Sequence, residues 1–323
     1  MSSTYCLSPI IVLYSALMIA FNELLQVILN TIVPIFLIIG ITMLVSRSKQ
    51  MDVGTLSRIS IYIFSPALVL TSISQTQLDT AELGSLMAAT LVACLVLVVL
   101  GTLAARGLRF NREIASSFAL AVFVMNSVNF GFPFIEFAFG PQGLEPAIAF
   151  SVGQGLMAYL LGTYVASRGR AGFKTAVRNA LTIPMPYAFI VAMAFNLTDT
   201  PIPPAIMQAA DVLGKGIIPV MLVVLSLQLR GARLRGQWQA IAWATLMRYG
   251  LGVLVGIAIA ALFGLQGLSR QVFILEMSMP AGVLSGVLST EFGGDPEFAA
   301  SVILVTTLTS AVFLSALLMW LNG

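Results

Sequence analysis

Long runs of apolar residues, separated by short polar segments, fill almost the whole chain. Apolar and polar positions do not alternate within these runs, so the runs predict helices and exclude the strands of a barrel. A helix needs roughly 20 mostly apolar residues to cross a bilayer. We therefore expect ten membrane-spanning helices, at 24–45, 57–76, 83–105, 112–139, 144–167, 178–197, 203–229, 237–263, 269–291 and 297–321.

Residues 1–23 precede the first expected span. The stretch 7–21 is apolar but short for a span, and no basic segment of a signal peptide stands before it. We expect an interfacial helix or a poorly ordered extension here, with Met18 as an alternative natural start.

The composition indicates that this protein lies in a lipid bilayer. Of 323 residues, 59% are hydrophobic and only 9% are charged, whereas soluble domains carry about 25% charged residues. The chain is therefore expected to be an all-α polytopic protein with the lipid bilayer as its surroundings. It has no histidine and two cysteines, Cys6 and Cys94. We therefore expect no metal site, no cofactor and no disulfide framework.

Basic residues gather in alternate loops. Thirteen of the 16 Lys and Arg follow expected spans one, three, five and seven: Arg47, Lys49, Arg58, Arg106, Arg109, Arg112, Arg168, Arg170, Lys174, Arg178, Arg230, Arg233 and Arg235. Because cytoplasmic loops carry an excess of Lys and Arg, these loops are expected in the cytoplasm. With ten spans, both termini then face the periplasm. The basic residues form no continuous patch, so a nucleic-acid partner is not expected.

Proline-containing segments recur in the same order at an offset of about 150 residues. The matched positions are Pro34 with Pro184 and Pro186, Pro66 with Pro219, Pro133 with Pro280, and Glu145 with Asp295. Five helices per repeat is an odd number, so the two repeats are expected to have inverted topology, as in many secondary transporters. We divide the chain into an extension 1–23, a first repeat 24–167, a cytoplasmic loop 168–177 and a second repeat 178–323.

Spans four and nine carry the strongest helix-breaking signals. Span four reads VMNSVNFGFPFIEFAFG at 124–140, and span nine reads ILEMSMPAGVLSGVLS at 274–289. Pro and Gly free backbone groups, which is tolerated at membrane depth only where the backbone packs in protein or lines a cavity. The N-termini of half-helices attract anions. We expect two broken helices that cross, with the substrate site at the crossing.

The motifs NTIVPIFLIIG, IFSPALVL, NSVNFGFP, LGKGIIPVMLVVLSLQL and MSMPAGVLSGVLSTEFG follow one another in the order found in a known family. From about residue 24 onward, the chain resembles the auxin efflux carriers, and most of all their compact bacterial branch. The resemblance implies broken, crossing helices four and nine, an elevator-like movement, transport of carboxylates, a scaffold that can form a homodimer, and a bacterial inner membrane. The plant carriers have a long hydrophilic loop between spans five and six, which this chain lacks, so auxin itself is not implied.

The resemblance places the family's crossover asparagine on Asn126 and its two crossover prolines on Pro133 and Pro280. We extend the expected substrate site to the neighbouring polar and unwound positions. The full set is Asn126, Asn129, Gly131, Pro133, Met279, Pro280 and Ala281. The side chain of Asn126 and the backbone amides near Gly131 and Ala281 are expected to hold a carboxylate.

A few charges fall within the expected spans. Arg248 lies midway through span eight, where a charge costs at least about 2.5 kcal/mol without a partner. Its expected partner is Glu276, and direct contact with a substrate carboxylate is the alternative. Glu276 can instead be protonated and couple transport to protons. Glu136 is a candidate gate, ion ligand or interfacial group. Asp211 and Lys215 are spaced to pair on one helix face.

These observations favour a carrier of small organic carboxylate anions. The main alternative is a sodium-coupled symporter of the bile-acid type. A cation/proton antiporter is less favoured, because spans three, four, five and ten contain no Asp. An intramembrane enzyme would need an Asp pair, a Ser with His or a His metal site, so catalytic residues are not expected.

Overall fold

The computed structural model describes Met18, Asn22, 24–167, 173–231, Leu234 and 237–322, and these residues form helices joined by short connections. The expectation for residues 1–23 therefore lies almost wholly outside the described part. The elements before the first break are η1 Ile28–Ile32, α2 Val33–Val45, α3 Val53–Ile59, η2 Ser60–Phe64, α4 Ser65–Ser74 and α5 Thr80–Gly107. Those that follow are α6 Arg112–Phe123, η3 Ser127–Gly131, α7 Phe132–Phe139, α8 Pro141–Ser167, α9 Phe173–Ala180 and α10 Met185–Leu197. The last are α11 Pro204–Lys215, α12 Ile217–Gly231, α13 Trp238–Leu262, α14 Gly267–Met277, α15 Val283–Phe292 and α16 Pro296–Asn322.

Seven helices in the described part are long and apolar enough to cross a membrane. They are Leu24–Val45, Val53–Ser74, Thr80–Gly107, Pro141–Val165, Pro204–Gly231, Trp238–Leu262 and Pro296–Asn322. The spans expected at 112–139, 178–197 and 269–291 are not among them, because each is made of shorter helices. The protein is thus an all-helical, multi-pass membrane protein.

Local sequence explains where the helices begin. Asp79 accepts a hydrogen bond from the Ala81 amide and so caps α5, and Asn111 caps α6 through the Ile114 amide at 2.9 Å. The segment expected as a cytoplasmic loop, 168–177, instead contains the beginning of α9.

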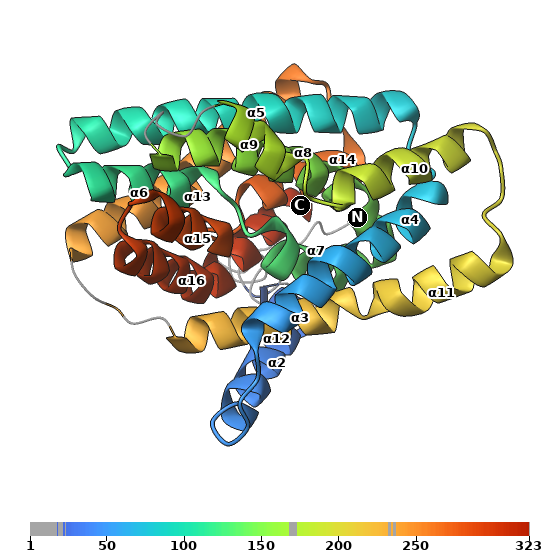
Figure 1. Ribbon diagram of the computed structural model, residues 1–323, viewed down its shortest axis with the longest axis horizontal. Helices are drawn as coiled ribbons and strands as arrows, with labels where there is room; N and C mark the ends of the chain where they lie inside the picture. Colours follow the sequence, from blue (N-terminus) through green and yellow to red (C-terminus); the bar gives the residue numbers. More distant parts are fainter. Residues whose placement is uncertain are drawn as a thin grey trace, which may run out of the picture.

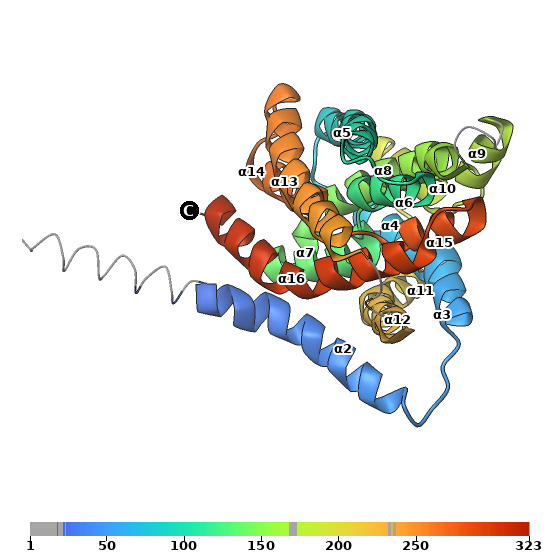
Figure 2. The same cartoon turned by 90° about the vertical axis from the view of Figure 1, so that its left-hand side faces the viewer.

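The helices pack as two groups. The flanking group consists of α2, α3, η2, α4, α10, α11 and α12, in which α4 contacts α10 and α11, and α12 contacts α2 and α3. The break group consists of α5, α6, η3, α7, α8, α13, α14, α15 and α16. Figure 1 shows α4, α10 and α11 together at one side and α6, α13, α15 and α16 at the other, with α5 running across the top. In Figure 2, α2 runs along the edge of the molecule, with α12 between it and the remaining helices.

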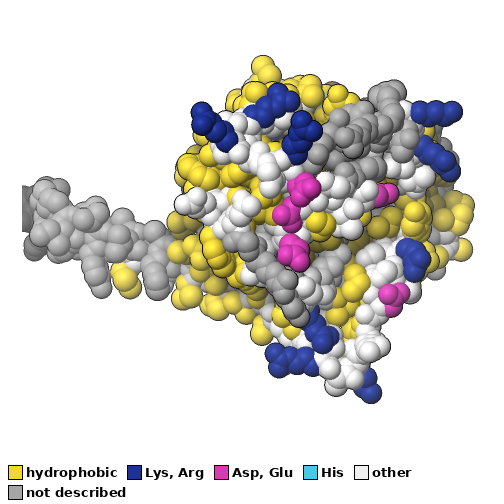
Figure 3. Space-filling model, turned by 60° about the vertical axis from the view of Figure 1, so that its left-hand side comes forward, with side chains coloured by type: hydrophobic (Ala, Val, Ile, Leu, Met, Phe, Trp, Pro, Cys, Tyr) yellow, Lys and Arg dark blue, Asp and Glu magenta, His cyan; other side chains and the backbone are white. Residues whose placement is uncertain are grey.

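The outer surface of the described part suits lipid. Large apolar side chains such as Leu262 and Val312 are 73% and 75% exposed, which in water would be an aggregation hazard. Figure 3 shows broad hydrophobic areas between Lys and Arg side chains that lie toward the rim. Among the described residues, Arg248 and Glu276 are the charged side chains that are fully buried.

Candidate functional site

Both predicted breaks are present, and they contact each other. The first lies between α6 and η3, and the second is the unwound stretch 278–282 between α14 and α15. Met125 and Ala281 form an antiparallel bridge. The Asn126 amide donates to the Pro280 carbonyl at 2.9 Å, and the Gly282 amide donates to the Val124 carbonyl at 2.8 Å. Each break thus satisfies backbone groups that the other has freed, which allows irregular backbone in the protein interior.

Gly282 is required by this close approach. A Cβ atom at this position would lie 2.7 Å from the Met125 carbonyl oxygen, which belongs to the opposite break. The position of the first break differs from the expected one. The helix is interrupted at Val124 and Asn126, whereas Pro133 lies in the first turn of α7, which follows η3 directly.

Arg248 contacts the C-terminal ends of α6 and α14, the helices that precede the two breaks. Its guanidinium donates to the carbonyl oxygens of Val122, near the end of α6, and of Met277, at the end of α14. These are the ends where helices have unpaired carbonyls and partial negative charge. The expected ion pair between Arg248 and Glu276 is therefore wrong. Freed carbonyls take the place of the carboxylate as partners of the arginine.

The space beside the breaks is a cavity of about 380 Å³, which we call the break cavity. Its lining comes from both breaks, from η3, α8 and α15, and from α3, η2, α4, α10 and α12 of the flanking group. The polar lining residues are Ser57, Ser65, Asn126, Ser127, Asn129, Ser151, Gln154, Tyr159 and Gln228. None of the described residues that line it carries a formal charge.

Several polar atoms at the break cavity have no partner within the protein. Asn126 Nδ2, Ser151 Oγ and Gln228 Oε1 are buried and make no hydrogen bond. Buried polar groups are nearly always paired in folded proteins, so three unpaired atoms around one cavity point to a ligand or water that they receive. Beside them, α15 begins at Val283 with no side-chain cap, and Val283 and Leu284 also line the cavity.

Comparison with known proteins finds similarity to membrane transporters. The family model described as "Membrane transport protein" matches residues 170–319. An uncharacterized transporter of Methanothermobacter thermautotrophicus is 28% identical over 274 residues, which cover 81% of this chain and 87% of the relative. An uncharacterized transporter of Methanocaldococcus jannaschii is 26% identical over 281 residues, covering 84% and 91%.

Residues 170–319 of this chain thus match the membrane transport protein family. The resemblance inferred from its motifs is thereby confirmed, and the protein is a transporter rather than an enzyme. Both relatives are archaeal, so the bacterial inner membrane and the periplasmic termini stay predictions.

The structure places the predicted site residues of this transporter unevenly. Asn126 and Asn129 line the break cavity, whereas Gly131, Pro133, Met279, Pro280 and Ala281 are buried and lie outside its lining. The amides expected to hold a carboxylate are already bonded, that of Gly131 to the Asn126 carbonyl at 2.9 Å and that of Ala281 to Thr306 Oγ1 at 3.1 Å. In this conformation neither amide is free to bind a carboxylate. Arg248 is also absent from the lining.

Sequence reasoning missed the contribution of α8. Gln154 accepts a hydrogen bond from Ser127 at 3.2 Å and donates to the Met125 carbonyl at 3.5 Å, so it holds the first break from the side. Ser151 and Gln154 are three residues apart, which puts them on one helix face. Two polar residues at that spacing in an apolar span were the available signal.

A second cavity of about 580 Å³, which we call the end cavity, lies between the same two groups of helices. Along α8, Glu145 lines the end cavity and Gln154 the break cavity; along α12, Pro219 lines the former and Gln228 the latter. The two cavities therefore lie at opposite ends of one interface. The charged residues of the end cavity are Glu136, Glu145, Asp211 and Lys215. The predicted pair of Lys215 with Asp211 is confirmed, at 2.5 Å.

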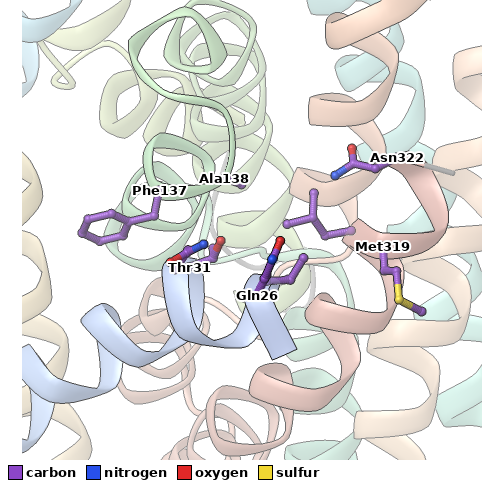
Figure 4. A pocket seen from close by; sticks show the side chains of 9 residues that line it. Gln26, Thr31, Phe137, Ala138, Met319 and Asn322 are labelled. Atoms are coloured by element: carbon purple, nitrogen blue, oxygen red, sulfur yellow. The ribbon is translucent and has the colours of Figure 1, made fainter. Parts of the chain in front are cut away.

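A third cavity, of about 380 Å³, lies between η1, α7 and α16. In Figure 4, Thr31 and Gln26 lie in the middle, with Phe137 on one side of them and Asn322 and Met319 on the other. It does not touch either break.

Proposed function

We propose that this transporter is a carrier for small organic carboxylate anions that bind in the break cavity. The observation that carries the proposal is the Asn126 side chain. Its Nδ2 group is a buried hydrogen-bond donor without an acceptor, in a cavity beside the uncapped N-terminus of α15. An acceptor-rich ligand such as a carboxylate would satisfy it.

Neutral groups can hold an anion here. A helix N-terminus carries about half a positive charge and stabilises an adjacent anion by up to about 2 kcal/mol when partly buried. Asn126, Asn129 and Ser151 supply further hydrogen-bond donors at the cavity. Its volume of about 380 Å³ is within the usual range for small-molecule sites.

We further propose alternating access of the elevator type. The break cavity and the end cavity occupy opposite ends of the interface between the break group and the flanking group. A displacement of the break group along the flanking group would move the site from one end of this interface toward the other. The inverted repeat, the crossing of the broken helices and the homodimer belong to the same proposal.

The test is transport by the purified protein in liposomes, with labelled acetate, lactate, succinate and malate as probes. Wild type is expected to carry at least one of them. Asn126→Ala should slow that transport about tenfold or more, because a lost hydrogen bond to a charged group costs about 1.5–3 kcal/mol. The matched control is Asn30→Ala, at an exposed asparagine outside the break cavity.

Two outcomes would contradict the proposal: no flux of any of the four probes, or equal flux in wild type and Asn126→Ala. Replacing sodium with choline separates the proposal from the sodium-coupled alternative, in which flux would stop.

A further inference from the structure

The carboxyl group of Glu276 stands apart from every other acidic group in the described part of the chain. It is 0% exposed, and neither of its oxygens has a hydrogen-bond partner. Glu276 lies one residue before the C-terminus of α14, beside the second break. A charge-bearing side chain in such a place is unusual in membrane proteins and marks a functional site more often than a structural one.

The carboxyl group faces the first break. A Cβ atom on Gly131 would lie 2.6 and 2.7 Å from the two Glu276 oxygens. The carboxyl group thus occupies the space that a side chain at position 131 would fill. The last residue of η3 is therefore glycine because the glutamate leaves no room for a side chain. The backbone conformation does not require glycine, since Gly131 has ordinary helical dihedrals.

The charged and titratable groups on neighbouring elements are engaged elsewhere. On α13, Arg248 donates to two backbone carbonyls, and the Tyr249 hydroxyl donates to the Thr306 carbonyl. Glu145 on α8 and Glu136 on α7 line the end cavity. Further groups on the elements that pack against α14 are Tyr159 and Tyr164 on α8 and Glu297 in the first turn of α16. No described group forms an ion pair with Glu276.

An ionised carboxylate in this position would lack both a counter-ion and a donor. The penalty for burying an unpaired charge is several kcal/mol even after relaxation of the protein. A neutral carboxylic acid avoids this penalty. The group can become ionised only when water reaches it.

Two cavities from which water could come lie near Glu276. Gly131 lies between Asn129, which lines the break cavity, and Glu136, which lines the end cavity. At 1.5 Å per helical residue, these two positions are about 10 Å apart. The carboxyl group is therefore close to both cavities and open to neither in this conformation.

We propose that Glu276 is the proton carrier that couples transport to the proton gradient. This proposal adds the coupling ion to the proposed function and rests on that proposed function. In one conformation the carboxylate takes up a proton from water on one side, forming the O–H bond. In the other conformation it releases that proton on the opposite side. One proton moving with one monocarboxylate anion makes the cargo neutral overall, which lowers the electrostatic cost of moving an anion through the membrane interior.

The first experiment needs no substrate. Infrared spectra of the purified protein in lipid nanodiscs, recorded across a pH series, report the carbonyl stretch of protonated carboxylic acids. Wild type should show a band that Glu276→Gln lacks and that the control Glu145→Gln keeps. Identical spectra for wild type and Glu276→Gln would overturn the proposal. Loss of the band on adding sodium at constant pH would also overturn it, because a sodium ion would then be the ligand.

The second experiment measures accumulation in liposomes of whichever of the four labelled probes wild type carries. With one proton per substrate, a pH difference of one unit should drive about tenfold accumulation, since one unit corresponds to about 1.4 kcal/mol. Glu276→Gln should lose this accumulation when it is normalised to the exchange of labelled substrate that the same variant carries out at equal pH on both sides. Equal accumulation in the two proteins would overturn the proposal.

A third variant guards against misfolding. Glu276→Asp retains a titratable carboxyl and should keep both the infrared band and the accumulation. Accumulation by Glu276→Asp without the band would overturn the proposal. If wild type carries none of the probes, the carboxylate carrier fails, while the infrared experiment still decides the protonation of Glu276.

Discussion

Arg248 donates a hydrogen bond to the carbonyl oxygen of Met277, the last residue of α14. The same guanidinium reaches the Val122 carbonyl near the end of α6. A positive charge that is 0% exposed is thus balanced by the partial negative charges of two helix C-termini, which together approach one elementary charge. The arginine stabilises the arrangement of the two breaks and does not line the break cavity.

Replacing Arg248 with Met should destabilise the protein strongly. Two buried carbonyls would lose their hydrogen-bond donor, and each loss should lower the free energy of unfolding by about 1–3 kcal/mol. We expect a lower thermal unfolding temperature in detergent and loss of transport. Arg248→Lys should be intermediate, because an ammonium group lacks the planar fork that reaches two acceptors. The half-buried Arg270 provides the control, and an Arg248→Met protein as stable as Arg270→Met would contradict this role.

Gly282→Ala should impair the contact between the breaks. The added methyl group would lie 2.7 Å from the Met125 carbonyl oxygen, so the two breaks must separate. Overpacking of this kind costs about 1–3 kcal/mol, and we expect transport to be lost with a reduced unfolding temperature. Gly286→Ala is the matched control on the same helix, since its methyl group would meet only the Ile303 side chain at 3.4 Å. Equal activity of the two variants would show that the breaks tolerate separation.

Ser151→Ala should separate binding from stability. Ser151 Oγ is buried and unpaired, so its removal costs the empty protein no hydrogen bond. If the hydroxyl donates to the substrate carboxylate, the apparent KM should rise about tenfold or more, because a hydrogen bond to a charged group contributes about 1.5–3 kcal/mol. The contrast is Ser289→Ala, which removes a hydrogen bond of 2.9 Å to Ser117. That variant should lower the unfolding temperature at unchanged KM, and the reverse pattern would exclude Ser151 from the site.

Cysteine labelling tests the sidedness of the two cavities. In a background in which Cys6 and Cys94 are replaced, Val287→Cys at the break cavity should react with a membrane-impermeant maleimide only from the side of the α5–α6 turn. Gln75→Cys at the end cavity should react only from the opposite side. Val312→Cys, which is exposed midway along α16, should stay unlabelled, because lipid excludes the reagent and the thiolate. Reaction of Val287→Cys and Gln75→Cys from the same side would contradict two opposed openings.

The sequence predicted the breaks well and their partners poorly. Gly and Pro in spans four and nine identify the interrupted helices, because these residues act locally on the backbone. The exact interruption at Val124 depends on its bond with Gly282, and no local sequence pattern contains a contact between residues so far apart in the chain. The partner of Arg248 was missed for a related reason. Its acceptors are backbone carbonyl groups at helix ends, and every residue type has a carbonyl, so the sequence does not mark them.

The predicted site residues show the same division. Asn126 and Asn129 were predicted from their position beside a break, and both line the break cavity. Gly131 and Ala281 were predicted from their amides, but those amides are used within the fold. Whether a backbone amide is free depends on tertiary partners such as Thr306, which the order of residues does not reveal.

The bonds across the breaks also constrain how the chain can be made. Most partners of the first break described above lie in the second half of the sequence: Arg248, Pro280, Ala281 and Gly282. A ribosome releases Val122 long before it has polymerised Arg248, 126 residues later. Until α13 and α14 are inserted, the first half must keep its unpaired carbonyls and amides in contact with water, lipid headgroups or the insertion machinery. The half-length chain is therefore an assembly intermediate, and a stop codon after α8 should yield a product for degradation rather than a smaller carrier.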